Sequence, residues 1–294
     1  HRAEIPERVD ANGEGLVPLE EDAVRSAGRR LYEAGIRSFC VAYLNAYLNP
    51  VHEQRTREVL LEELDCDQGV TVTLSTDILP EIQEYERTST AAVAAMLRPV
   101  MSKYVANLDE QLESLGAHGL AVRIMRSNAG LMSSRAAAAN PVPTLMSGPA
   151  GGVRASIEVG RLMGVQDIIT FDMGGTSTDV ALIEHVRPLE AMERDIEWNI
   201  PVRTPMLDIH SIGAGGGSIA WVDAARVLHV GPESAGAVPG PACYGRGGTK
   251  PTFTDASLVL GRIDADYFLG GAMKLDMRAA VAALKNLDVR SDWG

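Results

Sequence analysis

The stretch IITFDMGGTSTDV, residues 168–180, decides the fold that the sequence predicts. A β-branched run delivers Asp172, two glycines and hydroxyl residues follow, and Val180 begins a second apolar run. This pattern predicts two strands joined by a tight hairpin, in which Gly174 and Gly175 let the backbone come close to a ligand. An ordinary glycine hairpin capped by polar residues is the alternative interpretation.

The hairpin offers the groups that a phosphate-binding loop requires. Backbone N–H groups at Gly174 and Gly175, with the hydroxyls of Thr176 and Thr178, can hold phosphate oxygens. Asp172, at the end of the first strand, stands where a complex of Mg²⁺ and phosphate needs a carboxylate, which reaches the metal through water. We therefore expect Asp172 to be both a catalytic and a metal-binding residue, for Mg²⁺ or another divalent metal.

A second glycine cluster, Gly213 to Ser218 (GAGGGS), is similar to G-x-G-x-x-G, but Ser218 takes the place of the third glycine. The chain also contains no G-x-x-x-x-G-K-[ST] sequence, so it is not a P-loop enzyme. So many glycines lose entropy on ordering, which favours a loop that approaches a nucleoside or a substrate. The glycines expected to do so are Gly213, Gly215, Gly216 and Gly217.

Asp208 and His210 stand directly before this loop. If residues 206–212 form a strand, both side chains point to one face. They would then form a metal pair, or the carboxylate would orient the imidazole for proton transfer in catalysis. A strand histidine hydrogen-bonded to its neighbour is the alternative. His52 with Glu53 gives a weaker version of the same pattern.

Two further residues have both a structural and a functional interpretation. Asp255 either caps the helix that follows it or belongs to a site. Cys243 lies in a turn between Pro241 and Gly245, and a reactive thiolate there would need a nearby base. We favour an inert thiol.

The remaining chain alternates between helical and strand patterns. Apolar spacing predicts helices over 20–34 and 50–64, and β-branched runs predict strands over 38–44 and 70–74. This order favours an α/β fold with a mainly parallel sheet.

A long helical stretch opens at Pro80, and Pro99 should kink or divide it. Its apolar stripe from Met96 to Leu115 is assigned to the core. The alanine- and proline-rich residues 136–149 predict a boundary between two lobes, 1–140 and 141–294.

Composition excludes several classes of protein. Of the 294 residues 46% are hydrophobic and 22% charged, as in globular proteins, and the net charge of −12 argues against a nucleic-acid partner. Three separated cysteines are typical of reduced thiols, and no apolar run or leader pattern predicts membrane insertion or secretion. We expect a cytoplasmic protein. Because His1-Arg2-Ala3-Glu4 is not an initiator sequence, we also expect the middle portion of a larger polypeptide.

Several segments together resemble the hydantoinase A/5-oxoprolinase family. They are DMGGTSTDV (172–180), SGPAGGV (147–153), SIGAGGGSIA (211–220), GPESAGAVPGPACY (231–244) and PTFTDASLVLGR (251–262). The segments NPVHE (49–53) and EYERTST (84–90) are similar to family sequences too, so the resemblance covers nearly the whole chain.

The resemblance implies an actin-like ATPase fold of the ribonuclease-H-like type, with a mixed sheet and flanking helices. It implies ATP and Mg²⁺ as cofactors, a small cyclic amide such as a hydantoin or 5-oxoproline as substrate, and a hydantoinase B-type partner subunit or domain. Members use two D-x-G-G-T-type loops, and the N-terminal one is absent here. Two alternatives stay open: a subunit of an ATP-dependent ketone carboxylase, and a non-catalytic nucleotide-binding fragment.

Overall fold

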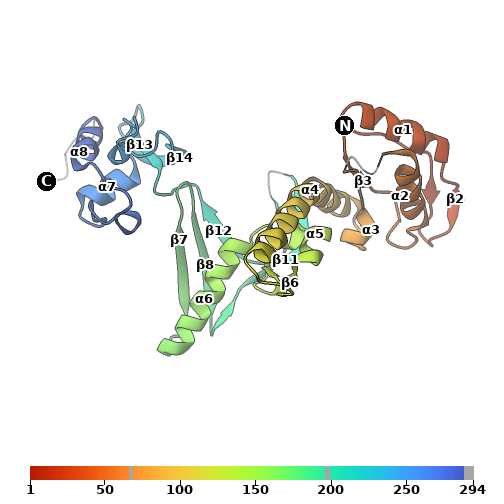
Figure 1. Ribbon diagram of the computed structural model, residues 1–294, viewed down its shortest axis with the longest axis horizontal. Helices are drawn as coiled ribbons and strands as arrows, with labels where there is room; N and C mark the ends of the chain where they lie inside the picture. The colour runs from red at the N-terminus through yellow and green to blue at the C-terminus, as the bar shows by residue number, and fades with distance from the viewer. Residues whose placement is uncertain (66–68, 196–198, 288–294) are drawn as a thin grey trace. The chain divides into compact units, whose positions relative to one another are not determined.

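The computed structural model describes residues 1–65, 69–195 and 199–287 and has a mixed α/β fold (Figure 1). The chain divides into two compact units. Residues 1–151 and 190–207 form the first, and residues 152–189 with the chain from Asp208 onward form the second. The division expected between residues 140 and 141 thus differs from the observed one, because residues 190–207 return to the first unit.

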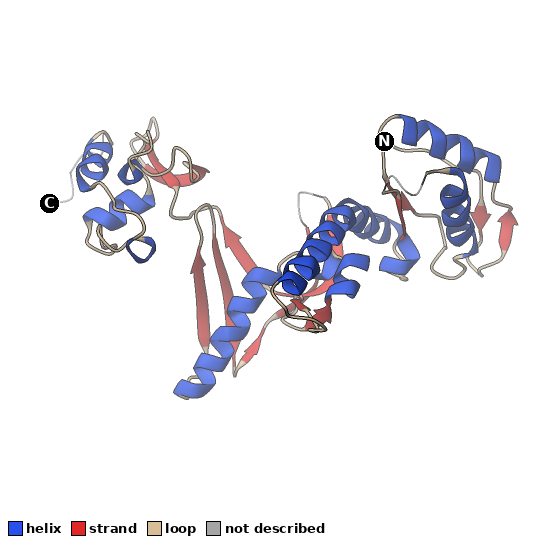
Figure 2. Cartoon of the chain, in the orientation of Figure 1, coloured by secondary structure: helices blue, strands red, loops and turns tan. Residues whose placement is uncertain are grey.

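The first unit combines helices with pairs of short strands (Figure 2). Its strands are β1 (Arg8–Val9), β2 (Gly15–Val17), β3 (Ser38–Val41), β4 (Thr71–Leu74), β5 (Arg123–Met125), β6 (Leu131–Ser133), β10 (Glu190–Asp195) and β11 (Pro201–Leu207). Its helices are α1 (Glu21–Glu33), α2 (Val51–Glu63), α3 (Ser75–Ile78), α4 (Glu84–Ser114) and α5 (Ser134–Ala139), with a 3₁₀ turn at Val142–Thr144. The strands pair as β1–β2, β3–β4, β5–β6 and β10–β11.

The expectation of a mainly parallel sheet is wrong. Among the described strands only β3 and β4 pair in parallel, with Ser38 opposite Thr71. The other pairs are antiparallel. Short connections explain the difference, because a few residues can join antiparallel strands whereas a parallel pair needs a longer crossover.

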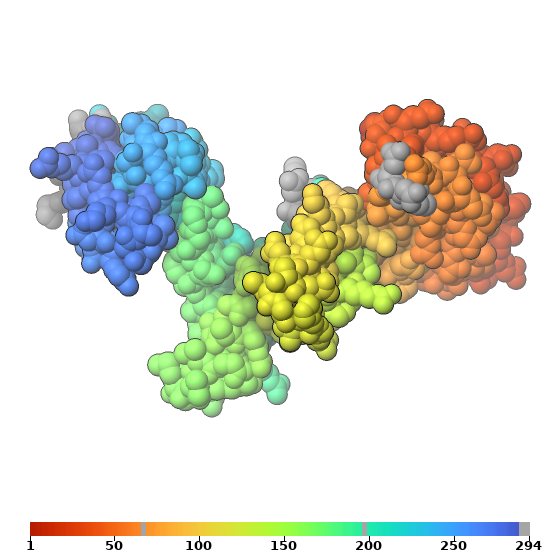
Figure 3. Space-filling view, viewed as in Figure 1, coloured from red at the N-terminus to blue at the C-terminus, as the bar shows by residue number. Residues whose placement is uncertain are grey.

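The N-terminal elements confirm the predicted helices and strands. Helix α1 ends before Gly35, whose φ of +88° suits a glycine, and the Gly35 amide donates to the Tyr32 carbonyl at 2.9 Å. Apolar residues of α1, α2, β3 and β4 form one core: Val24, Phe39, Val41, Val59, Leu60, Leu64, Val72 and Leu74. The atoms of the elements that enclose this core are red and orange in Figure 3.

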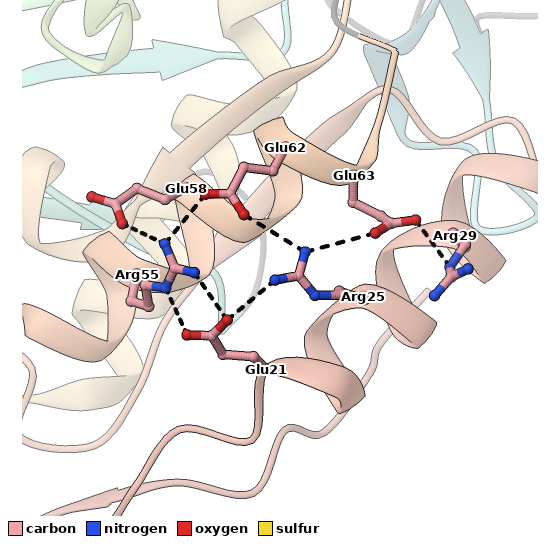
Figure 4. A network of polar contacts seen from close by, with 7 residues as sticks. All are labelled: Glu21, Arg25, Arg29, Arg55, Glu58, Glu62 and Glu63. Carbon is pink, nitrogen blue, oxygen red and sulfur yellow. Dashed lines mark hydrogen bonds and ion pairs between the residues drawn. The ribbon is translucent and has the colours of Figure 1, made fainter.

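Ion pairs join α1 to α2 at the surface of this core (Figure 4). Arg55 Nε lies 2.7 Å from Glu21 Oε1, and Arg25 lies 3.6 Å from Glu62. The Arg55 guanidinium holds the pKa of Glu21 below its ordinary value. Because these side chains are partly exposed, water and salt screen them, and the apolar core carries most of the stability of this helix pair.

A buried polar centre lies at the carboxyl ends of β3 and β4. The Glu53 carboxylate accepts from Ser75 Oγ at 2.6 Å and from the Thr76 amide at 3.1 Å. Arg87 Nε donates to the same Ser75 hydroxyl at 3.1 Å, and its Nη2 donates to the Tyr43 carbonyl at 2.7 Å. Both charged side chains are fully buried. This geometry gives Glu53 a structural role, and its neighbour His52 pairs separately with a glutamate of the N-terminal segment, 2.9 Å away.

Helix α4 does not follow the predicted packing. It is one helix across Pro99. Met96, Val100 and Leu115 are 67%, 70% and 81% exposed, so the assignment of this stripe to the core is wrong. The buried face instead carries small and polar residues near the helix start, and it packs with residues that include Val142 and Val202.

The second unit is built around an antiparallel sheet of order β12-β8-β7. Its strands are β7 (Ile168–Met173), β8 (Thr178–Glu184), β9 (Arg187–Pro188), β12 (Ile209–Ile212), β13 (Ser218–Val222) and β14 (Leu228–Ser234). Its helices are most of α6 (Ser147–Met163), α7 (Phe253–Val259) and α8 (Met277–Lys285), with 3₁₀ turns at Ala242–Tyr244 and Leu269–Gly271. The two strands of the predicted hairpin are confirmed as β7 and β8.

Helix α6 (Ser147–Met163) runs along β7. A Cβ on Gly160 would lie 2.4 Å from Ile168 Cδ1, and one on Gly152 would lie 4.0 Å from Asp172 Oδ2. The two glycines therefore let this helix lie close to the strand that delivers Asp172. Within the described ranges, no helix is both long and apolar enough to cross a membrane.

Candidate functional site

The predicted hairpin is present, and its loop is short. Strands β7 and β8 pair antiparallel up to Met173 opposite Thr178, which leaves residues 174–177 as the loop. The Gly174 amide donates to the Ser177 carbonyl at 2.8 Å and closes the turn. The hydrophobic strands on both sides thus present a fixed four-residue loop at the end of the sheet.

The tip of this loop is open. Gly175 and Thr176 are exposed, and no atom lies within 4 Å of the position that a Cβ of Gly175 would take. In the part of the chain that the structure describes, the amides of these two residues donate to no protein acceptor. Two free N–H groups and the Thr176 hydroxyl can therefore bind the oxygens of an anion.

The second glycine loop packs directly on the first. The Gly216 amide donates to the Gly174 carbonyl at 2.9 Å, and the Gly217 amide donates to the Gly175 carbonyl at 2.7 Å. A Cβ on Gly215 would lie 2.6 Å from the Thr176 backbone nitrogen. The structure thus brings the two predicted loops together, with no space for a side chain at Gly215.

This packing gives the second loop a supporting role. The amides of Gly216 and Gly217 are already used on the hairpin, and the Thr178 hydroxyl donates to the Ala214 carbonyl rather than pointing to open space. Gly213 is exposed. Ligand contacts by Thr178 and by the glycines of the second loop stay predictions.

Asp172 has an acidic neighbour that the sequence alone did not single out. Asp179 lies directly opposite Asp172 across β7 and β8, so the two carboxylates share one face of the sheet. Ser211, the partner of Asp179 on β12, donates its hydroxyl to Asp179 Oδ1 at 2.5 Å. The signal was available, because Asp172 and Asp179 stand two residues outside either end of the loop.

Like charges directly opposite each other destabilise a sheet, and a cation between them would relieve the repulsion. Two carboxylates beside a loop with two free amides fit a hard ion such as Mg²⁺, which keeps several waters and takes one or two carboxylates. Among the described residues there is no group of three or more His, Cys, Asp and Glu that could hold a metal by itself. The donor set therefore fits a metal that arrives with a phosphate ligand, rather than an all-protein metal site.

Asp208 and His210 are neighbours but do not join Asp172. His210 Nε2 lies 3.6 Å from Asp208 Oδ1, and the His210 side chain is 79% exposed. The expected strand over 206–212 is interrupted, because β11 ends at Leu207 and β12 begins at Ile209. His210 pairs with Val180, one position away from Asp179, so it faces the opposite side of the sheet from the two carboxylates. A catalytic role for Asp208 and His210 stays a prediction.

Asp255 and Cys243 have structural roles. Asp255 is buried and accepts from the amides of Thr252 at 2.9 Å and Cys243 at 2.7 Å. Thr252 is the N-cap of α7, and Asp255 completes its capping box from inside the helix. Burial, with the nearby Asp255 carboxylate, raises the pKa of Cys243 to about 12.

We therefore expect Cys243 to be unreactive in the folded protein. At pH 8 the thiol stays protonated, because its pKa lies far above the pH, and the reactive thiolate is scarce. Mass spectrometry after brief iodoacetamide treatment should find Cys243 unlabelled in native protein and labelled in urea. Labelling of Cys243 at the same rate in both states would contradict this assignment.

The comparisons with known proteins concern nearly the whole chain. The caprolactamase subunit alpha of Pseudomonas jessenii is 38% identical over 97% of this chain and 40% of its own length. The 5-oxoprolinase of Saccharomyces cerevisiae is 36% identical over 85% of this chain and 19% of its own length. The nucleotide-free structure of an acetone carboxylase matches 96% of this chain and 39% of its own, with a TM-score of 0.79 and 32% identity.

The chain therefore spans about two fifths, or less, of each of these relatives. The profile of the hydantoinase/oxoprolinase N-terminal region matches residues 1–64. The hydantoinase/oxoprolinase profile matches residues 87–292, which include both glycine loops and the capping box of α7. The resemblance found in the sequence is confirmed: the chain belongs to the hydantoinase/oxoprolinase family.

Proposed function

We propose that the loop of residues 174–177 binds the phosphates of ATP, and that the protein uses ATP to open a small cyclic amide. One observation carries the proposal: the free amides of Gly175 and Thr176 stand at the end of the strand that carries Asp172. Similarity to a caprolactamase and a 5-oxoprolinase supports the substrate class. We also propose that the two units belong to an actin-like ATPase fold of the ribonuclease-H-like type.

Each group of the loop has a task in this proposal. The amides of Gly175 and Thr176 donate to phosphate oxygens, and the Thr176 hydroxyl adds a third donor. Asp172 and Asp179 would hold Mg²⁺ through water on the same face. Bound Mg²⁺ would neutralise charge on the phosphoryl group as it transfers.

The chemistry explains why ATP is needed. A ring amide is a poor electrophile. Transfer of the terminal phosphoryl group of ATP to its oxygen, with release of ADP, activates the amide carbon. Water adds to that carbon, the ring C–N bond breaks as the nitrogen takes up a proton, and hydrolysis of the resulting acyl phosphate gives the carboxylate and phosphate. Fixed amides at the loop stabilise the charge that develops during the transfer, because they need no reorganisation. Asp208 and His210, which lie 3.6 Å apart, are proposed to assist proton transfer, although His210 faces the side of the sheet opposite Asp172 and Asp179.

A ketone carboxylase subunit is the second candidate, and similarity to an acetone carboxylase favours it. In either case we propose a partner, of the hydantoinase B type for the amide hydrolase, because the caprolactamase and acetone carboxylase relatives are named as subunits. We place the activity in the cytoplasm.

An assay of ATP consumption separates the candidates. The natural polypeptide, purified with its partner, is supplied with 5-oxoproline, hydantoin or caprolactam, and in parallel with acetone or acetophenone plus bicarbonate. We expect a cyclic amide to raise ADP release above the background. Stimulation by a ketone alone would favour the carboxylase, and stimulation by neither class would leave nucleotide binding without turnover and reject the proposal.

A further inference from the structure

Thr254 connects helix α7 to the phosphate loop. It is the second residue of α7 and is buried, with 7% of its surface exposed. Both its amide, at 2.9 Å, and its hydroxyl, at 2.8 Å, donate to the Gly216 carbonyl. A single carbonyl of the second glycine loop is thus held by two donors of one residue.

The opposite side of Gly216 holds the hairpin. The Gly216 amide donates to the Gly174 carbonyl, and the Gly217 amide donates to the Gly175 carbonyl. The Gly216 carbonyl and the Gly217 amide belong to the same peptide group. A hydrogen bond to this carbonyl therefore polarises the amide and strengthens the bond that the amide donates. A continuous series of hydrogen bonds thus connects Thr254, through Gly216, to the backbone of the loop that carries the free amides.

Hydrogen bonds hold the start of α7 in place, at the Thr254 end of this series of contacts. The Thr252 hydroxyl donates to Asp255 Oδ2 at 2.7 Å, and the buried carboxylate also accepts from the amides of Ala242 and Cys243. These bonds fix the first turn of α7 on the packed turn at Ala242–Tyr244. Thr254 therefore projects from a fixed element toward a loop whose own residues include three consecutive glycines.

We propose that Thr254 is a positioning residue: its hydroxyl holds the second glycine loop in place and thereby sets the conformation of residues 174–177 for binding phosphate. The nucleotide part of this inference rests on the proposed function. The positioning part does not, because it concerns hydrogen bonds that exist without a ligand.

The variant Thr254→Val tests the hydroxyl, since valine keeps the shape and the backbone amide of threonine. Thr254→Ser keeps the hydroxyl and loses the methyl group. Ser257→Ala is a matched control, because it removes another buried hydroxyl of α7 that has no hydrogen bond to the loops in the structure. Melting temperatures and circular dichroism establish that each variant is folded.

Amide hydrogen exchange of the nucleotide-free chain is the first measurement. We expect the amides of Gly216 and Gly217 to exchange about fivefold faster in Thr254→Val, the size of one neutral hydrogen bond, and at the original rate in Thr254→Ser. Unchanged exchange in Thr254→Val, or equal acceleration in Ser257→Ala, would overturn the inference.

Calorimetric titration with Mg-ATP is the second measurement. We expect Thr254→Val to weaken binding about fivefold and Thr254→Ser to restore it. If the original chain binds and Thr254→Val binds equally well, the positioning role is overturned while the proposed function stands. If exchange accelerates as expected but the original chain does not bind, the proposed function fails and the positioning of the loop stands.

Discussion

Replacement of Gly215 by alanine is expected to destabilise the second unit by about 3 kcal/mol and to abolish nucleotide binding. The new Cβ would lie 2.6 Å from the Thr176 nitrogen and 2.7 Å from the Ser177 nitrogen, both of them backbone atoms that cannot rotate away. The two loops must then separate. This breaks the bonds from Gly216 and Gly217 to the hairpin, which are 2.9 and 2.7 Å long.

Gly175→Ala provides the matched control for stability. It adds the same methyl group to the same pair of loops, but into open space. Urea unfolding followed by circular dichroism should give a clearly lower midpoint for Gly215→Ala and a nearly unchanged midpoint for Gly175→Ala. Equal midpoints in the two variants would mean that the loops do not pack as described.

Replacement of Glu53 by alanine is expected to cost the first unit about 3–5 kcal/mol, because it removes a buried carboxylate that accepts four hydrogen bonds and that Arg87 reaches through the Ser75 hydroxyl. Arg87 is fully buried and shares the Ser75 hydroxyl with Glu53. Without the carboxylate, the amides of Tyr43 and Thr76 also lose their acceptor. A buried donor left unsatisfied adds to the loss.

Glu58→Ala is the control, because it makes the same change on the same helix at a side chain that is 60% exposed. Its unfolding midpoint in urea should stay close to the original, whereas that of Glu53→Ala should fall strongly. Glu53→Gln, which keeps the shape and part of the hydrogen bonding, should be intermediate. A Glu53→Ala protein as stable as Glu58→Ala would contradict the structural role of this carboxylate.

The parts of the site that the sequence predicted were those with strong local signals. Two glycines between β-branched runs specify a hairpin, so residues 168–183 were predicted correctly. A positive φ at Gly35 ends α1 where the sequence indicated. These features depend on the residue's own conformational preferences, which sequence patterns report directly.

The parts that were missed depend on pairing and packing. The facing of Asp172 and Asp179 follows from strand register, and the support from Gly216 and Thr254 follows from contacts between distant segments. The register of β12, which pairs His210 with Val180 and so puts it on the other face of the sheet, has no local signal. On α4, alanines such as Ala94 are buried whereas larger side chains such as Met96 are exposed. The spacing of the large apolar residues therefore predicted the wrong face of the helix as the buried one.

Calorimetric titration of Mg-ATP into this chain and into an Asp172→Ala variant tests the central claim most directly. Asp167→Ala is the control, because it removes an exposed carboxylate that precedes the other end of β7. We predict saturable binding by the original chain and by Asp167→Ala, and none by Asp172→Ala. Absence of binding by the original chain, or undiminished binding by Asp172→Ala, would contradict a phosphate site at residues 172–177.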